Sequence, residues 1–72
     1  MLTYILSEIN GDEYVYIYYP EGKKDAPGKV GLLKNGEKRI IEESLEDLGR
    51  RYAHHALNGI DMSKESGTVA WY

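Results

Sequence analysis

The N-terminal part of the chain has two stretches rich in aliphatic and aromatic side chains, residues 2–9 and 12–19, on either side of Asn10-Gly11. Asn-Gly is typical of a tight hairpin turn, because both residues tolerate the positive φ that a type I′ turn requires. The pattern therefore predicts an antiparallel hairpin. With a two-residue turn, Leu6 lies opposite Val15 and Tyr4 lies opposite Ile17.

This register divides the hairpin into two faces, because successive strand residues point to opposite sides. We expect the first face to join the core, and it carries Leu2, Tyr4, Leu6, Val15, Ile17 and Tyr19. The second face carries Thr3, Ile5, Ser7, Ile9, Tyr14, Tyr16 and Tyr18. A four-residue turn preserves these two sets, whereas a three-residue turn with a bulge would mix them.

A second hairpin is predicted from residues 29–34 and 37–42, which flank Asn35-Gly36. A two-residue turn here places Lys34 opposite Glu37, a favourable cross-strand pair. Val30, Leu32 and Ile41 then share one face of the hairpin, and Leu33 and Ile40 share the other.

One helix is predicted from Ser44 to Asn58, with Ser44 as the N-cap residue and Asn58-Gly59 as the stop. Gly49 lies on the apolar stripe of this helix, where a glycine allows close approach to the sheet. Residues 67–72 then form a C-terminal strand. A right-handed strand–helix–strand connection makes this strand parallel to the fourth if both lie in one sheet.

The 72 residues are enough for one small domain. The predicted fold class is α+β: two antiparallel β-hairpins plus a C-terminal strand in one sheet, with a single α-helix packed on one face, in the order ββ-ββ-α-β. The residues expected to supply most of the core are Leu6, Val15, Ile17, Leu32, Ile41, Leu45, Leu48, Tyr52, Ala56, Val69 and Trp71.

The aromatic residues are seven tyrosines and one tryptophan, with no phenylalanine. One helix can cover only one face of the sheet, so the second hairpin face is expected to stay exposed. Large exposed apolar patches usually mark an interaction site. The main functional hypothesis is therefore a non-enzymatic protein-interaction module that binds itself or another protein. The residues of its interface are Ile5, Ile9, Tyr14, Tyr16 and Tyr18.

Charge adds an alternative hypothesis. The net charge is −3, yet the segment from Lys23 to Arg39 holds six basic and two acidic residues. Basic side chains beside exposed aromatic rings are typical of single-stranded nucleic-acid binding, in which cations neutralise phosphates and rings stack on bases. Lys23, Lys24, Lys38 and Arg39 are the residues of this alternative. The acidic remainder of the chain would repel phosphate.

Other classes of site receive little support from the sequence. His54 and His55 are adjacent, so on a helix they point in different directions and do not chelate one ion together. No metal site, no cofactor and no catalytic constellation is expected, because no nucleophile, base and orienting group are spaced to meet. The absence of cysteines, of a signal peptide and of a long apolar run predicts a cytoplasmic protein with no membrane segment.

Overall fold

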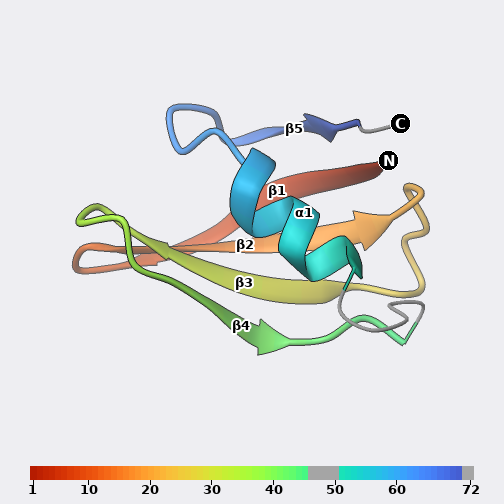
Figure 1. The fold of residues 1–72 in the computed structure, drawn as a ribbon, viewed down its shortest axis with the longest axis horizontal. Helices are drawn as coiled ribbons and strands as arrows, with labels where there is room; N and C mark the ends of the chain where they lie inside the picture. The colour runs from red at the N-terminus through yellow and green to blue at the C-terminus, as the bar shows by residue number, and fades with distance from the viewer. Residues whose placement is uncertain (46–50, 71–72) are drawn as a thin grey trace.

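The computed structural model describes residues 1–45 and 51–70, which form a five-stranded antiparallel sheet with one helix packed on it (Figure 1). The strands are β1 (Leu2–Asn10), β2 (Glu13–Pro20), β3 (Gly28–Leu33), β4 (Lys38–Glu42) and β5 (Ser66–Val69), and the helix is α1 (Arg51–Gly59). The strand order in the sheet is β4-β3-β2-β1-β5. The predicted α+β fold, with two hairpins and a C-terminal strand in one sheet, is confirmed.

β5 lies at the edge of the sheet opposite β4. It pairs antiparallel with β1, from Leu2 opposite Val69 to Ile5 opposite Ser66. Because every neighbouring pair in the sheet is antiparallel, β5 runs in the same direction as β4, as expected, although three strands separate them (Figure 1).

The first hairpin differs from its predicted register. Its turn is Gly11-Asp12, with Gly11 at φ +62°, and Asn10 lies opposite Glu13. Farther along, Ser7 is an extra residue between two consecutive pairs, so that Leu6 lies opposite Tyr16. The predicted pairing of Leu6 with Val15 is therefore wrong, because the turn is displaced and a bulge adds one residue.

A one-residue shift moves a whole set of side chains to the other face of a sheet. Leu2, Tyr4 and Leu6 consequently share their face with Tyr16 and Tyr18, instead of with Val15 and Ile17. This is the face that α1 covers. Its core cluster consists of Leu2, Tyr4, Tyr16, Tyr18, Val30, Leu32, Ala53 and Ala56.

The second hairpin is also shifted from the prediction. Its turn has three residues, because the backbone N–H of Leu33 donates to the carbonyl of Glu37 at 2.8 Å and Gly36 has φ +96°. Leu33, rather than Lys34, therefore faces Glu37. Val30 pairs with Ile40, so Ile40 packs against the core while Ile41 is exposed, and the prediction of Ile41 as a core residue is wrong.

The helix ends at Gly59, one residue beyond the predicted Asn58, and the N–H of Ile60 still donates to the carbonyl of Ala56 at 3.0 Å. The predictions for Leu48, Gly49 and Trp71, and the helix start after Ser44, lie outside the described residues. Leu45, expected in the core, is 96% exposed. Of the other predicted core residues, Val15, Leu32 and Ala56 are buried, and Leu6, Tyr52 and Val69 pack against the core cluster. Ile17, also predicted in the core, is only half-buried and does not belong to that cluster.

Candidate interaction surfaces

The predicted interface residues do not form one exposed surface. Tyr16 and Tyr18 are 0% exposed, and Tyr14 is partly buried against the core cluster. Ile5 and Ile9 are exposed, at 47% and 52%, but the bulge at Ser7 puts them on opposite faces of the sheet. The expectation that the three tyrosines share an exposed face is wrong, because it followed from the unbulged register.

The buried tyrosines hold the connecting segments onto the sheet. The Tyr16 hydroxyl donates to the carbonyl of Lys64 at 3.1 Å, and the Tyr18 hydroxyl accepts from the N–H of Ser44 at 3.2 Å. The Tyr4 ring meets the Tyr16 ring edge to face, with 5.7 Å between their centroids. Burial, followed by the neighbouring Tyr4, raises the pKa of Tyr16 above its usual range. These phenols therefore combine apolar packing with a bond to the loops, which explains tyrosine rather than phenylalanine here.

The face of the sheet opposite α1, which we call the open face, has an apolar centre. Alternation along the paired strands places on it Thr3, Ile5, Val15, Ile17, Tyr19, Lys29 and Arg39. Val15 is buried, Ile17 and Tyr19 are half-buried, and Ile5 is exposed. These apolar side chains thus form a row that runs from buried Val15 in β2 to exposed Ile5 in β1, on the face that α1 does not cover.

An ion pair crosses the open face between strands that are not neighbours. Nε and Nη2 of Arg39 in β4 donate to the two carboxylate oxygens of Glu13 in β2, at 2.6 and 2.8 Å. The bond to Arg39 holds the pKa of Glu13 below its usual range, against a smaller opposing effect of burial. The Glu13 carboxylate and Cγ of Arg39 lie over Gly31 in β3, whose missing side chain leaves the space.

The other end of the open face is covered by a cation. The Nζ atom of Lys24 lies 4.4 Å from the centroid of the Tyr19 ring, a distance typical of a cation–π contact. This contact holds the loop between β2 and β3 against the sheet. The apolar centre of the open face is therefore bordered by Lys24 at one end and by the Glu13–Arg39 pair at the other.

The residues of the nucleic-acid alternative are spread over different surfaces. Lys24 lies over Tyr19, and Arg39 is paired with Glu13 on the open face. Lys38, opposite Leu32, lies on the helix-side face. Two of the tyrosines that would stack on bases, Tyr16 and Tyr18, are buried. The structure therefore does not gather these cations around exposed aromatic rings.

A pocket at the edge of β1 was missed by the sequence analysis. It has a volume of about 480 Å³ and is lined by residues 5–9 of β1 together with Glu65 and Ser66. It lies beside Ser66, where β5 begins, and where Ser7 bulges from β1. One sequence signal for the bulge exists: the apolar residues Leu2, Tyr4 and Leu6 alternate strictly, but the next one, Ile9, is an odd number of residues away.

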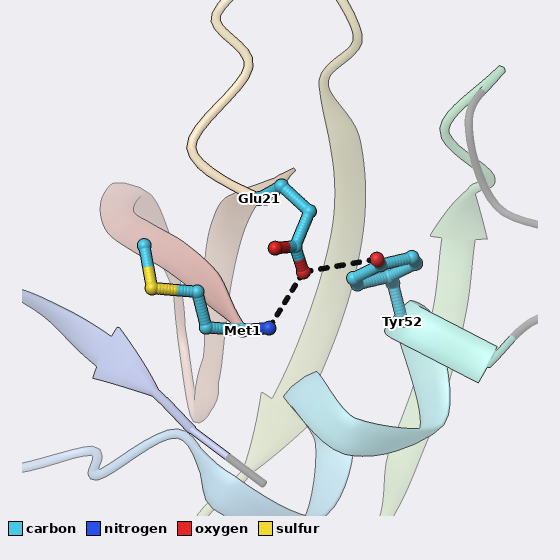
Figure 2. A network of polar contacts seen from close by, with 3 residues as sticks. All are labelled: Met1, Glu21 and Tyr52. Carbon is cyan, nitrogen blue, oxygen red and sulfur yellow. Dashed lines mark hydrogen bonds and ion pairs between the residues drawn. The ribbon is translucent and has the colours of Figure 1, made fainter. Parts of the chain in front are cut away.

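The N-terminal amine joins a polar network near the start of α1 (Figure 2). The Met1 amine donates to the Glu21 carboxylate at 2.6 Å, and the same oxygen accepts from the Tyr52 hydroxyl at 3.0 Å. The bond from the amine, followed by that from Tyr52, lowers the pKa of Glu21. This network connects the beginning of β1, the end of β2 and the helix, because the Glu21 carboxylate binds both the Met1 amine and the Tyr52 hydroxyl.

The two adjacent histidines of α1 differ in environment, since His54 is exposed and His55 is half-buried. Within residues 1–45 and 51–70, no group of three or more His, Asp or Glu side chains is arranged to hold a metal ion. None of the described helical residues forms a helix long and apolar enough to cross a membrane.

Comparisons with known proteins add no relative to this description. The chain matches no protein-family model, no curated protein and no solved structure at a significant level.

Proposed function

We propose that this chain is a non-enzymatic protein-interaction module that associates through the open face of its sheet, with a second copy of the chain as its partner. The observation that supports the proposal is the exposure of Ile5 at 47% at the end of the apolar row formed with Ile17 and Val15, on the face that α1 does not cover (Figure 1). Apolar surface of this kind is the usual centre of a protein–protein interface.

Charge on the open face is compatible with a symmetric pair. Two-fold rotation about an axis that is parallel to the strands and passes between β3 and β2 places β4 of one copy over β1 of the other. The basic residues Arg39 and Lys29 then approach Glu8, which is opposite Val15 at the far side of the face. Unlike charges at the rim orient such a pair more than they stabilise it.

The size of the face limits the strength of the association. The molecule measures 29 × 21 × 19 Å along its principal axes, so one face offers at most about 600 Å² to a partner. Two copies then bury about 1,200 Å², which is the lower end of the range for specific interfaces. We therefore expect a reversible dimer with a dissociation constant in the micromolar range or weaker.

Four polar groups of types that serve in reactions are used in structural contacts. The Ser44 hydroxyl donates to the carbonyl of Ala26 at 2.6 Å, and the Ser63 hydroxyl donates to Asp61 at 2.6 Å. Glu13 and Glu21 are held by Arg39 and by the Met1 amine. These contacts favour a binding role over a catalytic one.

Sedimentation equilibrium over a wide concentration range tests the proposal. We expect a concentration-dependent rise in mass toward the dimer, which Ile5→Thr weakens. The matched control is Ile9→Thr, the same substitution at an equally exposed isoleucine on the other face. A monomer at millimolar concentration, or equal weakening by both variants, would contradict association through the open face.

A further inference from the structure

The two edges of the sheet differ in how well they are protected against pairing with another strand. β4 is short, and its exposed residues include Lys38, Arg39 and Glu42. Short, charged edge strands are the usual means of preventing unwanted strand pairing. The short length and the charges of β4 therefore protect this edge against pairing with another strand.

The edge at β1 is only partly occupied. β5 pairs with β1 from Leu2 to Ile5, and the N–H of Leu6 donates to the carbonyl of Glu65 at 2.6 Å. Beyond that bond, no described strand runs along the outer side of residues 7–10. β1 thus continues past the end of β5 by almost half its length.

The unoccupied part of this edge forms one wall of the pocket of about 480 Å³. Ile5 and Ile9, exposed at 47% and 52%, lie at its two ends, and neither lysine nor proline occurs between them. The extra residue Ser7 lies in the middle of the wall. Bulges are frequent where a strand pairing ends or where a side chain is redirected near a functional site. We call this surface, residues 5–9 with Glu65 and Ser66, the edge groove.

The charges of the edge groove are of one sign. Glu8 and Glu65 are both exposed, and none of the described residues that line the pocket is basic. A second copy pairing here through the same segment would bring two Glu8 side chains together, which disfavours that occupant. An extended segment with lysine or arginine between apolar residues would complement both the carboxylates and the isoleucines.

We propose that the edge groove binds an extended peptide segment of another protein, in which basic residues alternate with β-branched apolar residues. The segment adds to β1 as a continuation of the line of β5, the binding mode known as β-augmentation. Main-chain hydrogen bonds to residues 7–10 supply affinity. Contacts with Ile9 and with the carboxylates of Glu8 and Glu65 supply selectivity. The edge groove shares Ile5 and Glu8 with the open face, but its main-chain contacts lie along the edge of β1 and do not require the dimer.

Titration of the ¹⁵N-labelled protein with short synthetic peptides, followed by amide chemical shifts, tests the proposal. The probe is a peptide of alternating valine and lysine. The matched controls are the same peptide with glutamate in place of lysine, and the valine–lysine peptide with a central proline that cannot pair as a strand. We expect saturable shifts at residues 7–10, Glu65 and Ser66 with the first peptide alone.

Two variants connect the binding to the groove. Glu8→Lys reverses one charge. It should therefore weaken binding of the valine–lysine peptide about two- to fivefold and strengthen binding of the glutamate peptide. Ile9→Thr removes exposed apolar surface and should weaken binding about fivefold. Ile17→Thr, on the open face, should leave peptide affinity unchanged while it weakens the dimer.

The outcomes separate the two proposals. No saturable shift at millimolar peptide, equal binding of all three peptides, or shifts confined to residues outside the edge groove would overturn the edge-groove proposal, whatever the state of the dimer. Conversely, a strictly monomeric protein that still binds the valine–lysine peptide at residues 7–10 supports the edge groove and rejects the open-face association.

Discussion

Arg39 and Glu13 are joined by two hydrogen bonds across a strand that belongs to neither of them. Arg39 lies in β4 and Glu13 in β2, and the strand between them contributes Gly31 at the crossing point. A Cβ atom at Gly31 would collide with Oε2 of Glu13. The glycine thus allows an ion pair between second-neighbour strands, which register alone would keep apart.

The pKa of Glu13 therefore reports whether this ion pair on the open face is formed. We expect an NMR titration to give a Glu13 pKa below the usual range of a glutamate carboxyl, and Arg39→Gln to raise it toward that range, because the hydrogen bond from Arg39 is the main cause of the lowered pKa. Since the folded-state pKa is the lower one, the contribution to stability is present above the unfolded-state pKa. It is lost as the pH falls through the folded-state pKa. An unchanged Glu13 titration in Arg39→Gln would contradict the ion pair.

Two glycines of β3 should differ in their response to substitution by alanine. At Gly28 a Cβ atom would collide with the ring of Tyr18, which is fully buried and cannot move aside. Gly28→Ala should therefore reduce the free energy of unfolding by about 1–3 kcal/mol. At Gly31 the neighbour is the end of the flexible Glu13 side chain.

The control Gly31→Ala should accordingly leave stability within about 1 kcal/mol, because the gain in strand propensity offsets the displaced carboxylate. The same variant should raise the pKa of Glu13. Denaturant unfolding of both variants checks the pair, and a smaller loss for Gly28→Ala than for Gly31→Ala would be inconsistent with the packing of Tyr18.

The buried hydroxyl of Ser44 connects two loops. It donates to the carbonyl of Ala26 at 2.6 Å, and both residues are buried. Ser44→Ala leaves that carbonyl without this donor, so we expect a loss of about 1–3 kcal/mol in the free energy of unfolding. Ser63→Ala, at an exposed serine whose hydroxyl bonds to Asp61, should cost less than about 0.5 kcal/mol. Thermal or urea unfolding distinguishes the two, and equal costs would argue against the Ser44–Ala26 bond.

The bulge at Ser7 predicts an unusual tolerance of deletion. Leu6 pairs with Tyr16 and Glu8 pairs with Val15, which are consecutive positions of β2. Deleting Ser7 therefore removes the bulge and leaves all the pairs between β1 and β2 unchanged. The fold should persist with nearly native stability.

Deletion of Ile5 is the matched control, because it shortens β1 by the same single residue. Here the chain can absorb the change only by moving Leu6 to the open face and Ser7 into the core opposite Tyr16. We expect a loss of at least about 2 kcal/mol. Comparable melting temperatures for the two deletions would show that the register is not as described.

The elements of this fold could be predicted from sequence more reliably than its faces. Each Asn-Gly lies at a turn, the helix ends at Gly59, and five strands occur in the predicted order. The faces were wrong because β2 carries apolar or aromatic side chains at nearly every position from Tyr14 to Tyr19, so its sequence contains no alternation that would fix the register. Only the spacing of Leu6 and Ile9 in β1 hinted at the shift.

The candidate surfaces were predictable to a smaller extent. Ile5 and Ile9 were identified as interface residues and are exposed, but their separation onto two faces follows from the bulge at Ser7, whose one sequence signal is the odd spacing between Leu6 and Ile9. The edge groove depends on where β5 ends along β1, a relationship between residues at opposite ends of the chain. Local patterns carry no information about such a pairing.

That pairing also has a kinetic meaning. The first four strands form a meander in which each strand meets the next in sequence, whereas β5 joins β1 only after the chain between Leu2 and Val69 has closed into a loop. A contact that closes a loop of nearly the full chain forms most slowly, and it has the largest entropic cost. β5 should therefore assemble last and open first. The amides of Gly67 and Thr68 should exchange with solvent faster than those in the middle of β2.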